Sequence, residues 1–140
     1  MATRIRPELS ANNKYWISKH RYYELKHFCL QYPMWKKAYA ALEDLTISSP
    51  KFEEILAPTN TPADPTAKCA LMKVHYSEIM EMVEKIAMET DRELGVYIFK
   101  AVTEELSYNY LKMKLEMPCS KDMYYDRYRK FFWLLSKERW

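Results

Sequence analysis

The three histidines are the first candidates for chemistry, because imidazole binds metals and transfers protons near neutral pH. His20 and His27 are seven residues apart and can share one face of a helix, whereas His75 lies far along the chain. No cysteine or carboxylate completes a metal-binding pattern around them. We therefore expect no metal site and no cofactor.

The cysteines and the paired carboxylates do not form a catalytic set either. Cys29, Cys69 and Cys119 are widely separated and include no CxxC pair, so we expect three reduced thiols in the core. The adjacent glutamates at 53–54 and 104–105 are neighbours in sequence rather than groups that converge from different elements, and we expect them on solvated faces. We predict that the chain is not an enzyme.

The composition describes a soluble globular chain of 140 residues, of which 49% are hydrophobic and 15% aromatic, with a mean hydropathy of −0.50. Its single glycine, Gly95, argues against glycine-rich phosphate loops and tight hairpins. No stretch approaches the roughly 18 apolar residues of a membrane helix, and the N-terminus lacks the apolar segment of a secretory signal. We expect a cytoplasmic protein that does not enter a membrane.

The charged residues are distributed unevenly. Residues 1–45 contain 8 basic and 4 acidic side chains, residues 46–106 contain 6 and 11, and residues 107–140 contain 8 and 4. The overall net charge of +3 therefore conceals segment charges of +4, −5 and +4. A basic end can hold a polyanion while the acidic middle stays in solvent, which is compatible with nucleic-acid binding. A chance imbalance is the alternative.

The last 34 residues indicate two helices joined by a short turn. Ser107 can cap a helix over 108–115, the turn EMPCS follows, and Ser120 can cap a longer helix over 121–139. Pro118 keeps the turn from becoming helical. Together with the helix expected before them, these elements have the lengths of a helix-turn-helix, whose last helix lies in the major groove of DNA.

Helical periodicity divides the final helix into two faces. Tyr124, Tyr128, Phe131 and Leu135 recur every three or four positions and are expected to be buried. The remaining surface is polar and cationic, which suits contacts with phosphates and base edges, although a merely solvated basic face is the alternative. The residues expected to contact DNA are Lys112, Ser120, Lys121, Asp122, Tyr125, Arg127, Arg129 and Lys130.

The roles of these residues follow from their chemistry. Arg127 and Arg129 are expected to contact bases or phosphates, because a guanidinium group pairs with both. Lys112 and Lys121 are expected on phosphates, and Tyr125 offers a hydroxyl or a contact with a thymine methyl group.

Helical spacing over the rest of the chain predicts an all-α fold of five or six helices. We expect a kinked N-terminal helical arm within 1–45 and a proline-rich connector over 46–64, in which residues 51–56 can form a short helical turn. A long helix and the helix-turn-helix follow within 65–140, and the whole forms one compact domain.

Two expectations concern the middle of the chain. The long helix should begin at Pro65 and turn an apolar stripe that starts with Ala67, Leu71 and Val74 toward the core. Asp91 is the expected N-cap of the next helix, in which Gly95 marks a close crossing with a neighbouring helix.

The N-terminal arm carries more aromatic side chains than two helices can bury. Tyr22, Leu25 and Cys29 recur at helical spacing and are expected to face inward. The surplus aromatic side chains either complete the core against the long helix or form an interface with a second copy or another partner.

The segment KAVTEELSYNYLKMKLEMPCSKDMYYDRYRKFFWLLSKER resembles the C-terminal part of phage and prophage transcriptional regulators of the RinA and ArpU kind, whose end is similar to the DNA-binding region 4 of sigma factors. The upstream segment YWISKHRYYELKHFCLQYPMWKKAYAAL is similar to their helical front half. The resemblance implies regulation of late phage transcription inside a bacterial host cell. It makes residues 107–115 the supporting helix and residues 120–130 the helix that lies on double-stranded DNA.

Several alternatives stay open at this stage. The turn and the aromatic final helix depart from the family pattern, so the sequence does not define which bases are recognised. RNA polymerase or another host protein is a further partner, and a homodimer is open. A phage interaction protein that inhibits or adapts a host macromolecule, such as an anti-defence factor, is the main alternative function, and a DNA-packaging subunit is a third.

Overall fold

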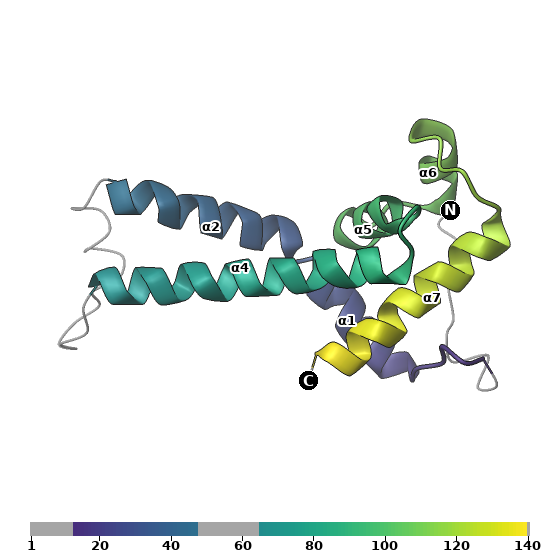
Figure 1. Cartoon of the computed structure of the whole chain (residues 1–140), viewed down its shortest axis with the longest axis horizontal. Helices are drawn as coiled ribbons and strands as arrows, with labels where there is room; N and C mark the ends of the chain where they lie inside the picture. Colours follow the sequence, from purple (N-terminus) through teal and green to yellow (C-terminus); the bar gives the residue numbers. More distant parts are fainter. Residues whose placement is uncertain (1–12, 48–64, 140) are drawn as a thin grey trace. The chain divides into compact units, whose positions relative to one another are not determined.

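The computed structural model describes residues 13–47 and 65–139, and within them every regular element is a helix, which confirms the all-α prediction. Most of the predicted connector, including the short turn expected at 51–56, lies outside the described residues. The described chain forms six helices (Figure 1): α1 Lys19–Cys29, α2 Tyr32–Ile47, α4 Pro65–Thr90, α5 Gly95–Glu104, α6 Tyr108–Lys114 and α7 Lys121–Glu138.

The chain divides into two compact units. Unit 1 comprises Met1–Tyr32 and Val83–Trp140, and unit 2 comprises Pro33–Met82. The borders between the two units therefore fall inside α2 and α4. Unit 1 contains α1, the end of α4, and helices α5 to α7.

Unit 2 is a helical hairpin of α2 and the first part of α4. Leu42 and Cys69 form its buried cluster, against which Tyr76 packs, and Trp35 is buried as well. The Cys69 thiol donates a hydrogen bond to the Leu42 carbonyl at 3.7 Å, and the Lys73 ammonium lies 5.9 Å from the centre of the Tyr39 ring. This small contact layer leaves much of the apolar surface of the hairpin in solvent.

The predicted inward stripe of α4 is wrong in its first half, whereas its later members Val83 and Ile86 are buried as expected. Ala67, Leu71 and Val74 are exposed, Leu71 by 69% and Val74 by 52%. The inward face instead repeats every seven residues, through Cys69, Tyr76, Val83 and Thr90, with partly or fully buried side chains four positions after each of the first three. This stripe includes Lys73, Tyr76 and Thr90, so it is less apolar than the exposed stripe. Periodicity alone therefore favoured the wrong face in the first half of α4.

Thr90 is accepted in the core because its hydroxyl is satisfied locally. It donates to the Ile86 carbonyl at 2.7 Å, one turn back along α4. A buried hydroxyl without such a partner costs about 1–3 kcal/mol.

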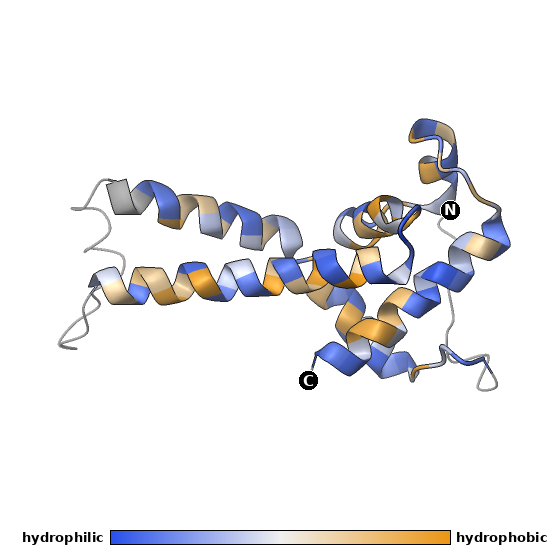
Figure 2. Ribbon diagram, viewed as in Figure 1, coloured by the Kyte–Doolittle hydropathy of each residue, from blue (hydrophilic) through white to orange (hydrophobic). Residues whose placement is uncertain are grey.

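Unit 1 is assembled around the aromatic face of α7. The predicted stripe of Tyr124, Tyr128, Phe131 and Leu135 is buried, together with Phe132. Figure 2 shows hydrophobic residues concentrated on α5, whereas both ends of α7 are hydrophilic. The core of unit 1 also contains the predicted face of α1, namely Tyr22, Leu25 and Cys29.

The α4–α5 junction corrects one predicted cap and supports the predicted crossing. Asp91 does not cap α5, which begins at Gly95; its carboxylate accepts hydrogen bonds from the backbone N–H groups of Glu93 and Leu94 and so closes the preceding turn. A Cβ at Gly95 would lie 2.7 Å from the Met88 sulfur and 3.0 Å from the Ala87 carbonyl oxygen. The absence of a side chain at Gly95 thus permits close packing between α4 and α5.

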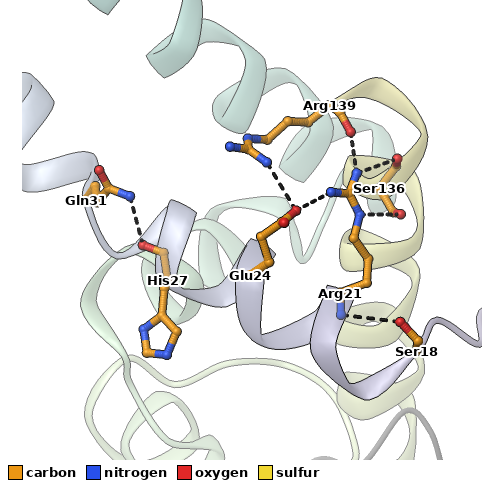
Figure 3. Close-up of polar contacts among 7 residues, drawn as sticks. All are labelled: Ser18, Arg21, Glu24, His27, Gln31, Ser136 and Arg139. Atoms are coloured by element: carbon orange, nitrogen blue, oxygen red, sulfur yellow. Dashed lines mark hydrogen bonds and ion pairs between the residues drawn. The ribbon is translucent and has the colours of Figure 1, made fainter.

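Arg21 of α1 holds the C-terminal end of α7 (Figure 3). Its guanidinium donates to the Ser136 hydroxyl and to the Ser136 carbonyl, both at 3.0 Å, and to the Arg139 carbonyl. It also pairs with Glu24, which accepts a further bond at 3.3 Å from the Arg139 guanidinium. The last carbonyls of a helix lack intrahelical partners and carry partial negative charge, so a cation placed there stabilises the end of α7.

We predict that Arg21→Ala lowers the free energy of unfolding by about 1–3 kcal/mol, because it removes charge-assisted hydrogen bonds to α7 and leaves the helix end without a cap. Urea denaturation followed by circular dichroism measures the change. Lys19→Ala, at an exposed position of the same helix, is the matched control and should change stability by less than about 0.5 kcal/mol. Equal losses in the two variants would show that the Arg21 contacts contribute nothing specific.

Candidate nucleic-acid interface

The two predicted N-caps in the segment from α6 to α7 are confirmed. Ser107 and Ser120 are the N-caps of α6 and α7, and their hydroxyls accept from the N–H groups of Tyr110 at 3.1 Å and Met123 at 3.3 Å. Leu111 and Met117 are fully buried. The two short polar side chains thus define where each helix starts.

The turn uses a left-handed residue where a glycine is often found. Glu116 has a φ of 54°, and the N–H of the following Met117 donates to the Leu111 carbonyl at 3.1 Å. A residue other than glycine pays roughly 1–2 kcal/mol for this conformation. The hydrogen bond and the burial of Met117 hold the backbone there.

Lys112 is exposed and also makes contacts within the turn. Its ammonium donates to the carbonyls of Met117 at 3.2 Å and Cys119 at 3.1 Å. These hydrogen bonds give Lys112 a structural role, because they join α6 to the residues that precede α7.

The exposed part of α7 within the described chain is limited to its two ends. Lys121, Asp122 and Met123 are exposed in the first turn, next to the exposed cap Ser120. The Lys121 ammonium lies 6.0 Å from the centre of the Tyr125 ring. Ser120, Lys121 and Asp122, three of the predicted contact residues, are thus brought together at one exposed end of unit 1.

Arg127 does not stand free, contrary to the expectation that it contacts bases or phosphates. Its Nε donates to the Asp91 carboxylate at 2.9 Å, and its Nη1 pairs with the adjacent Asp126. Only 28% of the Arg127 side chain is exposed. Two carboxylates neutralise this guanidinium, so its role is to tie α7 to the turn that precedes α5.

Arg129, Lys130 and Tyr125 are half-buried. The Nε of Arg129 is inaccessible to solvent and makes no hydrogen bond within the described residues. The Tyr125 ring packs against Tyr108 and Tyr124, at centroid distances of 6.1 and 5.2 Å. These three side chains are therefore less available to a large partner than the sequence-based prediction assumed.

The N-terminal stretch covers the second half of α7. Tyr15 and Ile17 are buried, and the Tyr15 ring lies 5.3 Å from the Trp133 ring at an angle of 59°. This contact joins residues more than a hundred positions apart, so periodicity within α7 could not predict it. In the second half of α7, Trp133 is therefore covered by Tyr15, in addition to the buried face that contains Phe131 and Leu135.

The three cysteines are free thiols, and all three are buried. Burial raises the pKa of the Cys29 thiol to about 12, and burial likewise raises the pKa of Cys119, so neither is a ready nucleophile at neutral pH. Among the described side chains, no group of three histidine, cysteine or acidic residues could hold a metal ion. No helix of the described chain is long and apolar enough to cross a bilayer.

Two residues of this site were not assigned by the sequence-based prediction. Lys114 is exposed at the end of α6. The sequence signal for it was a basic residue at the end of the predicted supporting helix. Asp91 was expected as a helix cap, and its second carboxylate oxygen holds Arg127 from 36 residues away. No local sequence signal indicates that pair.

No protein-family model, curated protein sequence or solved structure matches this chain. The resemblance to phage regulators therefore stays a prediction, and function is inferred from the residues of the site.

The Asp91–Arg127 pair makes a specific contribution to the pH dependence of stability. Burial alone raises the pKa of Asp91, but hydrogen bonds from Leu94, Arg127 and Glu93 outweigh it, and the pKa is lowered. A lowered pKa in the folded state stabilises the protein above the unfolded pKa, near 3.9, and this contribution disappears as the pH falls through the folded value.

We predict that Asp91→Asn costs about 1 kcal/mol of stability at pH 7 and that the deficit shrinks at pH 3, because protonation of Asp91 in the unfolded wild-type chain removes part of the stabilisation. Urea denaturation at the two pH values measures it. Glu93→Gln, at an exposed position in the same turn, is the control and should show little deficit at either pH. A deficit for Asp91→Asn that is the same at both pH values would contradict an ionic role.

Proposed function

We propose that unit 1 binds double-stranded DNA through the exposed end formed by the last residues of α6, the turn at 115–120 and the first turn of α7. The observation that supports this best is that Lys114 at the end of α6 and Lys121 in the first turn of α7 are both exposed, while the aromatic face of α7 is buried. A helix-turn-helix presents this same part of its second helix to the major groove.

Lys114 and Lys121 are the proposed phosphate contacts, because both are exposed and neither makes a salt bridge within the described residues. The positive end of the α7 dipole and the Ser120 hydroxyl add to the attraction for a phosphate. Asp122 is placed to accept a hydrogen bond from a cytosine amino group. Arg127 acts indirectly in this proposal, by holding α7 in position through Asp91.

The proposed biological role is regulation of phage transcription in the cytoplasm of a bacterial host. It rests on the resemblance of the C-terminal segment to regulators of the RinA and ArpU kind. RNA polymerase or another host protein is the further partner that this role implies, and a homodimer would place two such ends on two half-sites of an operator.

A duplex-binding titration tests the proposal. We expect fluorescently labelled random duplex to bind, with an affinity that falls linearly in a plot of log K against log salt. The double variant Lys114→Ala/Lys121→Ala should weaken binding and reduce the magnitude of the slope by about 2, because each phosphate contact contributes about 0.9.

The matched control is Lys36→Ala/Lys37→Ala, which removes the same charge from exposed positions of α2 in unit 2. It should leave the slope nearly unchanged. Equal effects of the two double variants would mean that the attraction is not localised at α6 and α7, and no binding to duplex would refute the proposal.

A protein-binding role is the second candidate, and a different observation favours it. Leu71 and Val74 are one turn apart on α4 and are largely exposed, and Met34 of α2 is also exposed. An exposed apolar helix face in a small protein often marks a protein interface. A chain that fails to bind duplex and captures a host protein through unit 2 would favour this function, including the anti-defence role.

A further inference from the structure

Unit 1 contains a tyrosine-lined pocket that the proposed DNA contact does not use. The pocket has a volume of about 120 Å³ and lies between α1, the α5–α6 junction and the first half of α7. The side chains of six tyrosines line it, together with Lys26 and Glu105: Tyr22, Tyr23, Tyr108, Tyr124, Tyr125 and Tyr128. The walls therefore offer aromatic faces and hydroxyl groups in one small space.

The size of the pocket suits a single ring. An engineered apolar cavity of about 150 Å³ in another protein binds benzene. The volume of that cavity is similar to the volume of this pocket. Drug-sized ligands occupy larger sites, of about 300–1,000 Å³. Aromatic rings pack well against tyrosines in tilted or edge-to-face geometry, which is also how the tyrosines contact one another here.

One tyrosine hydroxyl at the pocket makes no hydrogen bond to the described protein and is not sealed from solvent. Tyr124 is 1% exposed, and its hydroxyl makes no hydrogen bond within the described part of the chain. The neighbouring Tyr22 and Tyr128 differ, because their hydroxyls lie 3.0 Å apart and bond to each other. Burial raises the pKa of Tyr124, so its hydroxyl remains a neutral donor at neutral pH. A ligand oxygen is the group that would satisfy it.

The polar groups of the lining provide a second contact. The Lys26 ammonium lies 3.5 Å from a Glu105 carboxylate oxygen, and the Glu105 side chain is 64% exposed. An exposed ion pair contributes little to stability, so an incoming carboxylate can replace Glu105 at Lys26 at small cost. The same lysine is 6.0 Å from the Tyr23 ring.

We propose that this pocket binds a single aromatic ring that carries a carboxylate and, across the ring, a hydroxyl group. The ring packs among the tyrosines, the ring hydroxyl accepts a hydrogen bond from Tyr124, and the carboxylate pairs with Lys26. The ligand is either a free aromatic acid or the C-terminal tyrosine of a peptide, which carries the terminal carboxylate. This inference goes beyond DNA binding and does not depend on it.

The probe for the first source is 4-hydroxybenzoate, titrated into the full chain and followed by calorimetry and NMR. We expect a dissociation constant below about 1 mM, within the efficiency that very small ligands reach. Cyclohexanecarboxylate, which lacks the aromatic ring, and 4-hydroxybenzylamine, which carries the opposite charge, should bind at least about tenfold more weakly.

Two variants separate the Tyr124 contact from general effects on folding. Tyr124→Phe keeps the ring and should weaken 4-hydroxybenzoate by about fivefold to tenfold, while benzoate, which lacks the ring hydroxyl, should lose little. Tyr110→Phe, at an exposed tyrosine outside the pocket, is the matched control and should not change either affinity. Lys26→Met should weaken both acids.

A peptide that ends in tyrosine distinguishes the two sources. Tighter binding of the peptide than of 4-hydroxybenzoate would assign the pocket to a protein segment, and the reverse would assign it to a free acid. The proposal is overturned if none of these acids binds, if the amine and the acid bind equally, or if Tyr124→Phe and Tyr110→Phe behave alike while both variants remain folded by circular dichroism.

Discussion

Burial of the aromatic face of α7 is the constraint on which unit 1 depends. Tyr124, Tyr128, Phe131, Phe132 and Leu135 are all buried, and full burial of such side chains contributes roughly 1.5–3 kcal/mol each. This face fixes the rotation of α7 about its axis. The cap at one end and the contacts from α1 at the other then fix where the helix begins and how its C-terminal end is held. The surface that α7 presents is a consequence of this packing.

The same packing gives the two ends of α7 different roles. Its C-terminal half is enclosed, since Tyr15 packs on Trp133 and Arg21 binds the last carbonyls. Its first turn is exposed beside Lys114, which is why the proposed contact with DNA is confined to that end. Between them, the tyrosines that cannot all pack tightly against one another leave the small pocket. Tyr124 and Tyr128 therefore belong both to the aromatic packing of α7 and to the lining of the pocket.

Local signals in the sequence were sufficient for the elements of unit 1 but not for their charge pairing. Ser107 and Ser120 act within three residues of themselves, so the helix starts were predictable, and the apolar period of α7 defined its buried face. Arg127 has its partner 36 positions away, so nothing near it indicated that its charge is neutralised. In the first half of α4 the apolar residues Leu71 and Val74 lie in solvent, and the inward face contains Lys73, whose ammonium lies near the Tyr39 ring.

Amide hydrogen exchange, measured by mass spectrometry with and without random duplex DNA, tests the central claim most directly. The account predicts that residues 128–135 exchange slowly in the free chain, and that the duplex slows exchange chiefly at residues 112–123. Fast exchange throughout α7 would contradict the buried aromatic face. Protection that appears instead at residues 65–82 would contradict DNA contact through the α6–α7 end of unit 1.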